Sequence, residues 1–218
     1  MLCLYLGCTK EQEPVPERPI PEYKLPDEFL RYFAFKPGSY WVYKNKKNGM
    51  IDTVTVIDYK FGYHTLVSAT DGKALYKYED FGNVLISTAY QALYSINAQP
   101  IGPIIDKNTM NACYDLNLSS NGPWGGGASD RVMFFPMKHG ESYDLWRSGG
   151  KTILKNQDTT LYIKSSKYDS VNLFYSDYSS IFHNSKVNLF FKKNIGIIRR
   201  TNLDNGDDWE MVDYKTYY

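Results

Sequence analysis

The sequence predicts a mainly β fold: a single antiparallel, strongly curved sheet, half-barrel or sandwich-like, with a β-meander and at most one or two short helices. Three observations lead to this prediction. Aromatic residues make up 16% of the 218 residues, and 20 of them are tyrosines, which suit strands that have one wet face. Glycine-containing turn pairs recur about every ten residues, and apolar and polar residues alternate near the C-terminus, both typical of neighbouring antiparallel strands.

The composition narrows the classes of partner. There are 25 basic and 24 acidic residues, for a formal net charge of +1, so the chain lacks the basic surface that nucleic acids require, and no nucleic-acid partner is expected. The hydrophobic fraction of 43% is that of a globular protein. The tyrosine rings fit half-exposed strand positions, and the alternative is a set of stacking platforms for a ligand such as a sugar.

The N-terminal residues indicate where the protein resides. No stretch approaches the roughly 20 apolar residues that span a bilayer, but residues 4–8, Leu-Tyr-Leu-Gly-Cys, resemble the lipobox of bacterial lipoproteins. In that motif a small residue precedes the cysteine, a signal peptidase cleaves between them, and the thiol receives a diacylglycerol. The resemblance implies lipidation of Cys8, with residues 1–8 as the remnant of a signal peptide.

The residues after Cys8 indicate a localisation signal followed by a proline-rich tether. The sequence Thr-Lys-Glu-Gln-Glu at 9–13 resembles the signal that sends some Gram-negative lipoproteins to the outer face of the outer membrane, which implies a lipid-anchored protein exposed at the cell surface. Residues 14–26 are rich in proline, which favours polyproline II at about 3.1 Å per residue. We therefore interpret 9–26 as a stiff tether of up to about 50 Å; the alternative is a proline-rich ligand for a partner domain.

Residues 27–218 are expected to form a single β-rich domain. Asp27 is expected to cap a short helical turn over 28–31, and the first clear strand is expected at 39–43. Asn-Gly and Asp-Gly pairs accept the positive φ of tight turns. Hairpin signals are therefore assigned to four pairs: Asn48-Gly49, Asp71-Gly72 and Gly82-Asn83, with a weaker break at Phe61-Gly62.

The middle of the chain is harder to interpret. Apolar pairs recur every four residues over 85–94, which makes a helix or helical turns one of the possibilities for 87–96, with a strand at 84–87 leading into it. Residues 99–140 show the least regular pattern. They include Trp124 among three glycines, which indicates either a mobile loop whose tryptophan packs on the sheet or a binding loop. Trp124, Trp146 and Tyr143 are the candidate ligand-binding residues.

Strands return in the C-terminal half. In residues 186–192, Val187, Leu189 and Phe191 share one face. Gly196 within a strand predicts a bulge or a sharp bend, and Asn205-Gly206 predicts a final hairpin turn rather than a calcium loop. The candidate strands of this half are 131–135, 143–146, 152–155, 160–164, 171–175, 186–192, 195–200 and 209–214.

Both ends of the body show a further resemblance. Residues 35–43, Phe-Lys-Pro-Gly-Ser-Tyr-Trp-Val-Tyr, with Asp-Thr-Val at 52–54, and residues 190–199, Phe-Phe-Lys-Lys-Asn-Ile-Gly-Ile-Ile-Arg, followed by Trp209-Glu210, are similar to the opening and closing segments of uncharacterised Gram-negative surface lipoproteins. The resemblance covers both ends of the domain and not its middle. It implies a structural role for these motifs and supplies no catalytic residues.

No motif in the chain indicates catalysis, a metal or a cofactor. Phosphate loops, nucleophile elbows and metal-binding histidine pairs are absent from the sequence, and Cys113 is interpreted as a small buried hydrophobe. The first hypothesis is therefore a non-enzymatic lipoprotein that binds a glycan, a lipid or another envelope protein. The alternative is an envelope hydrolase with a site around His139 and Glu141, near Asp144.

Overall fold

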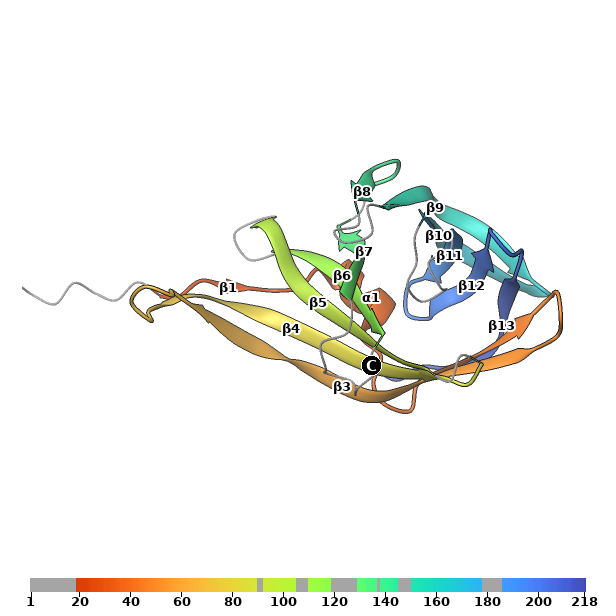
Figure 1. Cartoon of the computed structure of the whole chain (residues 1–218), viewed down its shortest axis with the longest axis horizontal. Helices are drawn as coiled ribbons and strands as arrows, with labels where there is room; N and C mark the ends of the chain where they lie inside the picture. The colour runs from red at the N-terminus through yellow and green to blue at the C-terminus, as the bar shows by residue number, and fades with distance from the viewer. Residues whose placement is uncertain are drawn as a thin grey trace, which may run out of the picture.

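The computed structural model describes residues 19–89, 92–104, 110–118, 129–136, 138–144, 150–177 and 186–218 of the chain. Strands dominate this part, as expected (Figure 1). Its elements, in chain order, are β1 (Glu22–Tyr23), α1 (Asp27–Phe33), β2 (Tyr40–Asn45), β3 (Ile51–Val67), β4 (Ala74–Ser87), β5 (Ala92–Ile104), β6 (Met110–Leu118), β7 (Ser129–Phe135), β8 (Ser142–Asp144), β9 (Lys151–Ile163), β10 (Ser166–Ser176), β11 (Val187–Lys192), β12 (Gly196–Asn202) and β13 (Asp208–Lys215).

The thirteen strands of the described residues join into one sheet built from two meanders. Its order is β7-β6-β5-β4-β3-β2-β13-β12-β11-β10-β9-β8, so the strands from β2 to β7 and those from β8 to β13 each follow the chain. The two meanders meet where β2 pairs with β13, with Trp209 opposite Asn45. The path ends at β7 and β8, and no pairing between these two closes the described sheet. The predicted meander is confirmed.

The sheet is mixed, which corrects the prediction of a purely antiparallel one. β1 pairs in parallel with β4, with Glu22 opposite Lys77 and Tyr23 opposite Tyr78. β5 pairs with β4 only from Phe81 onward, so β1 takes the edge of β4 that β5 leaves free. The chain enters along this edge in the same direction as β4 and then forms α1. A parallel pair results because β1 and β4 are not joined by a hairpin.

The strong turn signals are confirmed. β2 and β3 are joined around Gly49, β3 and β4 around Gly72, and β12 and β13 around Gly206, and all three glycines have positive φ. Gly196 also has positive φ, at 91°, and an added Cβ there would lie 3.3 Å from the ring of Phe35. The pairing of β11 with β12 shifts register close to Gly196, as predicted for a bulge.

Two of the four breaks predicted in the first half are wrong. Phe61-Gly62 lies inside β3, and Gly82-Asn83 lies inside β4. The ladder continues because glycine still supplies its N–H and C=O: Gly62 pairs with Asp80, and Gly82 pairs with Lys60. Similarly, the two strands expected at 152–155 and 160–164 are one strand, β9.

The middle of the chain is more regular than its pattern indicates. The helical alternative for 87–96 is wrong, because β4 ends at Ser87, a turn follows, and β5 begins at Ala92. The spacing of four between apolar pairs comes from two strands that meet at a turn. Residues 99–140 contain the end of β5 and all of β6 and β7.

The one helix of the described residues packs its aromatic side chains into the core. α1 begins after Pro26, and no side chain caps its first turn, so the capping role predicted for Asp27 is wrong; the aspartate lies in that turn instead. Phe29, Tyr32 and Phe33 are buried. Its seven residues make about two turns, too few to be stable as an isolated helix, so tertiary packing stabilises α1.

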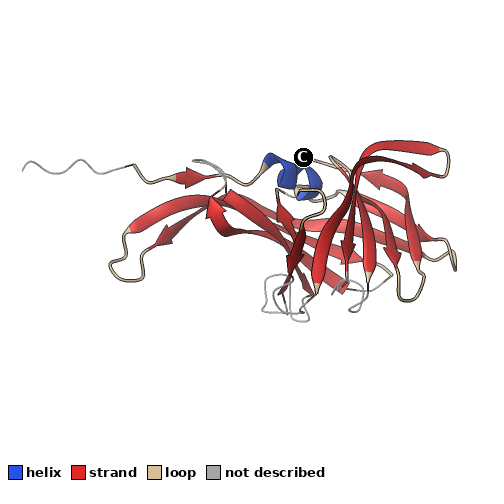
Figure 2. Cartoon of the chain, turned by 90° about the horizontal axis from the view of Figure 1, so that it is seen from above, coloured by secondary structure: helices blue, strands red, loops and turns tan. Residues whose placement is uncertain are grey.

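The rings of α1 contact strands that lie far apart in the sheet. Phe29 lies 5.5 Å from Phe81 of β4 and 5.6 Å from Phe135 of β7, measured between ring centroids. Phe33 lies 5.8 Å from Phe135 and 5.5 Å from Phe191 of β11. The helix therefore forms the centre of the core, against strands of both meanders (Figures 1 and 2).

The C-terminal strands alternate as predicted. Buried and half-buried residues alternate along β11 from Val187 to Lys192, so one face of this strand packs against the core. β10, β12 and β13 match the expected strands within a few residues. β8 covers Ser142–Asp144 of the strand expected at 143–146, and the rest of that strand lies outside the described residues.

Two residues of the predicted tether belong to the sheet. Glu22 and Tyr23 form β1, and Leu25 is 2% exposed. Residues 9–18 of the tether, with Cys8 and the predicted leader, lie outside the described part. The division of the chain into leader, tether and body stays a prediction.

Candidate binding surface

A two-stranded extension of the sheet is the most exposed apolar region that the structure describes. β3 residues 59–67 and β4 residues 74–80 pair with each other beyond the last β4–β5 pair at Phe81. We call this segment the arm. Nine residues of β3 give it a length of about 27 Å, and it leads away from the rest of the sheet, with β1 along one edge (Figures 1 and 2).

The face of the arm that continues the core face is only partly covered. Phe61 and Phe81 sit directly opposite each other, and Phe81 is 1% exposed because Phe29 and Tyr59 pack on it. Phe61 is 41% exposed and Tyr63 is 49% exposed. We call this side, with alternate residues of β3 from Phe61 to Val67, the inner face of the arm. Large apolar side chains on it can bind an apolar or aromatic surface.

A buried carboxylate orders the base of this face. Glu79 is 7% exposed. Its Oε2 accepts a hydrogen bond from the Leu25 N–H at 2.8 Å, and its Oε1 accepts one from the Tyr63 hydroxyl at 3.1 Å. Partial desolvation raises the pKa of Tyr63, and the hydrogen bond to Glu79 adds to this effect. The neutral hydroxyl therefore stays a donor, and Glu79 links the chain after β1 to both strands of the arm.

The opposite face of the arm is polar and aromatic. Asp80 accepts contacts from Lys60 Nζ and His64 Nε2, both at 3.1 Å. His64 stacks on Tyr78 with 6.0 Å between the ring centroids, and Tyr23 meets Tyr76 edge to face. These groups are half exposed, and their charges are matched, so this face has the character of an ordinary solvated strand surface.

The deepest charges belong to the body of the sheet. Asp52 is fully buried and pairs with Arg200. Its Oδ1 also accepts hydrogen bonds from Ser87 Oγ at 2.7 Å and from the Ala89 N–H at 3.1 Å. The guanidinium of Arg200 lies 4.6 Å from the ring centroid of Tyr43.

Aromatic side chains surround the guanidinium of the Asp52–Arg200 pair. Burial raises the pKa of Tyr43, and its neutral hydroxyl donates to the Ile197 carbonyl at 2.8 Å. The Arg200 guanidinium also lies 4.9 Å from the Trp209 ring. Since Asp52 has no exposed surface, the arrangement fixes strands β3, β4 and β12 rather than presenting a charge to a ligand.

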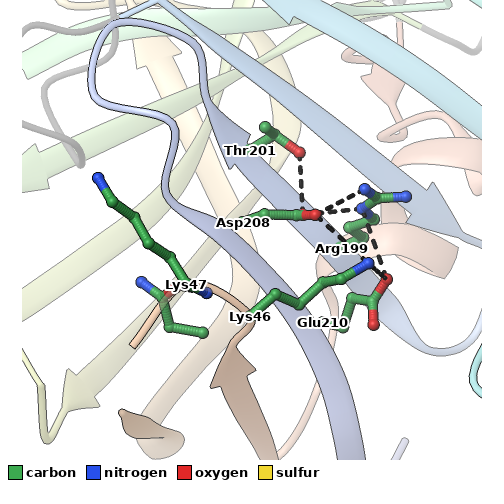
Figure 3. A network of polar contacts seen from close by, with 7 residues as sticks. Lys46, Lys47, Arg199, Thr201, Asp208 and Glu210 are labelled. Carbon is green, nitrogen blue, oxygen red and sulfur yellow. Dashed lines mark hydrogen bonds and ion pairs between the residues drawn. The ribbon is translucent and has the colours of Figure 1, made fainter. Parts of the chain in front are cut away.

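A second network of ion pairs joins β2, β12 and β13 on the outer face of the sheet. Arg199 donates to both carboxylate oxygens of Asp208, at 2.9 and 2.7 Å. Lys46 lies 3.1 Å from Glu210 and 3.7 Å from Asp208, and Thr201 donates to Asp208 at 3.2 Å. Figure 3 shows these side chains converging on Asp208.

The pKa values in this network follow the pairing. Burial pushes the pKa of Asp208 upward, but the hydrogen bonds and charge of Arg199, together with Lys46 and Thr201, outweigh it and hold that pKa below its ordinary value. The hydrogen bond to Asp208 likewise raises the pKa of Arg199. Opposite charges are satisfied within the network, which cross-links β2, β12 and β13.

The predicted site residues fall mostly outside the described part. Trp124, Trp146 and Cys8 are not described, and Tyr143 lies in β8 without a described side chain. His139 Nε2 hydrogen-bonds to the Lys155 carbonyl oxygen at 2.8 Å, and Glu141 pairs with Lys138 at 3.5 Å. These contacts direct the two side chains to different partners. The ligand-binding and hydrolase residues stay predictions.

The arm was missed at the sequence level. Residues 57–67, Ile-Asp-Tyr-Lys-Phe-Gly-Tyr-His-Thr-Leu-Val, alternate apolar and polar side chains as a long strand does. Gly62 interrupted that pattern and was interpreted as a turn. The signal that could have found the arm is the alternation on both sides of this glycine.

Comparison with known proteins gives no relative. No family model, no curated protein and no solved structure matches the chain. Within the described residues, no helix has the length and apolar character needed to cross a bilayer. In the same residues, no three His, Cys, Asp or Glu side chains gather where they could hold a metal ion.

Proposed function

We propose that this chain is an outer-membrane lipoprotein, anchored through Cys8 and exposed at the cell surface, whose β domain binds a ligand or an envelope partner without catalysis. The observation that carries the binding function is the inner face of the arm. It continues the core face of the sheet, yet Phe61 and Tyr63 on it are 41% and 49% exposed. Large aromatic side chains left uncovered beside a packed core are typical of binding surfaces.

We further propose that the sheet is strongly curved, as a half-barrel around α1. In the strand order, β7 and β11 are eight spacings apart, or about 38 Å in a flat sheet. Phe33 nevertheless contacts Phe135 of β7 and Phe191 of β11. Side chains stand roughly perpendicular to a sheet, so the Asp52–Arg200 pair, which crosses β2 and β13, also supports a bend toward this face.

The ligand class follows from the exposed side chains. Tyrosine and phenylalanine present flat rings that stack on sugars, pack against acyl chains or anchor a protein partner. The ligand is therefore a glycan, a lipid or an envelope protein. Catalysis needs a positioned acid, base or nucleophile, and the contacts of His139 and Glu141 lead to Lys155 and Lys138.

Acylation of Cys8 tests the anchor directly. Mass spectrometry of the protein from bacterial membrane fractions should find the diacylglycerol modification on this residue, and a Cys8→Ala chain should carry no such modification. Cys113→Ala is the matched control, because it removes a thiol from strand β6 and should leave the modification of Cys8 in place. An unmodified Cys8, or a Cys8→Ala chain that still carries the diacylglycerol, contradicts the proposal.

A further inference from the structure

Three exposed aliphatic side chains form a row at the outer end of the arm's inner face. Leu75 and Val67 are 49% and 53% exposed, and Ile20 is 40% exposed. Val67 pairs with Ala74, and the register shift beside this pair inserts Leu75 as the extra residue. We call these three residues the aliphatic row.

Ile20 joins this row through the parallel register of β1. Glu22 pairs with Lys77, and the Lys77 N–H donates to the Pro21 carbonyl at 2.9 Å. Continuing this ladder by two residues brings Ile20 level with Leu75. Residues two apart in a strand share a face, so Ile20 lies on the side of Glu22, and Leu75 on the side of Lys77. The row thus crosses three neighbouring segments of chain.

The aliphatic row lies where the chain enters the folded domain. Pro19 is the first described residue, and Cys8 precedes it by eleven residues. An extended chain of that length reaches at most about 34 Å at 3.1 Å per residue. An acyl group on Cys8 would therefore keep the outer end of the arm within about 34 Å of the bilayer, the reach of the chain between them.

The surroundings of the row match a lipid–water interface. Behind it lie the Glu22–Lys77 ion pair, with a 3.1 Å contact, and exposed Tyr63; on the other face Tyr23 and Tyr76 are in contact. Tyrosines are enriched at the headgroup level of membranes. At the turn, Lys73 pairs with Asp71 at 3.6 Å, and its long side chain can extend toward phosphate groups.

The arm carries no net charge, so electrostatic attraction or repulsion would not decide its contact with lipid. Residues 60–80 hold three lysines and three carboxylates: Lys60, Lys73, Lys77, Asp71, Glu79 and Asp80. Contact with lipid would therefore depend on burial of apolar surface, which salt does not screen.

We propose that the aliphatic row docks on the surface of the lipid bilayer and inserts Ile20, Val67 and Leu75 into the interface. The inference rests on the proposed function for one point, the acyl anchor that brings the row to the bilayer. Docking at a second place beside the anchor would fix the orientation of the sheet on the membrane, because two contacts restrict rotation that one tether allows.

Flotation with lipid vesicles tests the docking without the anchor. The full chain carrying Cys8→Ser is mixed with vesicles of phosphatidylethanolamine and phosphatidylglycerol. We expect it to float with the vesicles at low and high salt alike, and Val67→Asp or Leu75→Asp to reduce the bound fraction about tenfold. Leu203→Asp is the matched control, since Leu203 is 45% exposed in the turn between β12 and β13 and should change nothing.

A second measurement locates the inserted residue. In the same Cys8→Ser chain, Leu75→Trp and Leu203→Trp each add one tryptophan. Lipids with brominated acyl chains should quench the fluorescence that Leu75→Trp adds and leave that of Leu203→Trp unchanged. Equal quenching of the two, or none, overturns the inference.

The other outcomes separate the two proposals. A Cys8→Ser chain that does not bind vesicles overturns the docking, even where Cys8 is acylated in membranes. A chain that floats through the row while Cys8 is unmodified supports the docking and overturns the anchor. A dimer in solution that Leu75→Asp dissociates overturns the docking, because a second copy then covers the row.

Discussion

The body of the sheet and the arm differ in how far they bury the two phenylalanines of one cross-strand pair. Phe61 and Phe81 are opposite each other on neighbouring strands, yet Phe81 is 1% exposed and Phe61 is 41% exposed. Phe81 lies under Phe29 of α1, at 5.5 Å between ring centroids, whereas Phe61 belongs to the arm. Burial in this sheet is thus decided by what covers a strand and not by the pattern within it.

Truncation of Phe29 should give the largest loss of stability. Its ring is fully buried and contacts rings on α1, β4 and β7. Phe29→Ala leaves a cavity between α1 and the meander of β2 to β7 and should lower the free energy of unfolding by about 3–5 kcal/mol. Urea denaturation followed by circular dichroism measures it.

The same substitution on the arm, Phe61→Ala, gives the contrasting measurement to Phe29→Ala. Phe61→Ala removes an equal ring from a half-exposed site, so we expect a change within about 0.5 kcal/mol. Comparable losses in the two variants would show that the arm is packed as tightly as the body.

Removal of one partner from the buried ion pair should rank second. Arg200→Met leaves the carboxylate of Asp52 buried without its cation, and we expect a loss of about 3 kcal/mol, since Ser87 and Ala89 still donate to it. The double variant Arg200→Met with Asp52→Asn removes both charges and should recover part of this loss. A double variant less stable than the single one contradicts this account of the pair.

Acid should weaken the outer network by a smaller amount. The folded state holds the pKa of Asp208 below its ordinary value, so the unfolded chain binds a proton first as the pH falls. The stability from this group is present above its unfolded pKa, near 4, and is lost as the pH falls through the lower folded pKa.

Denaturation midpoints at several pH values measure this dependence. Asp208→Asn should lower stability at neutral pH by about 1 kcal/mol and flatten the decline in acid. An unchanged acid profile in this variant would assign the decline to other carboxylates.

The sequence predicted the elements whose signals are local. Asn48-Gly49, Asp71-Gly72 and Asn205-Gly206 mark hairpins because the turn geometry depends on the residues themselves. The alternation in β11 likewise reports its own two faces. The short helix was also predicted, although it begins at Asp27, directly after Pro26, without the predicted side-chain cap.

Features that depend on distant contacts were not predictable. The turn expected at Phe61-Gly62 is part of a strand because β4 pairs along its whole length. The pairing of β1 with β4 and the burial of Asp52 by Arg200 join residues far apart in the chain. Neither leaves a pattern within a short window. The inner face of the arm was not predicted for the same reason. Its exposure depends on how far along the sheet α1 packs.

The seam between β2 and β13 has a consequence for the order of folding. These two strands lie in the middle of the sheet order but near opposite ends of the chain, and Lys46 and Glu210, in contact across the seam, are 164 residues apart. Contacts of such separation close late, because the loop entropy is lost before they form. Each meander can assemble from neighbours as it is synthesised, but the centre of the sheet must wait for the last residues.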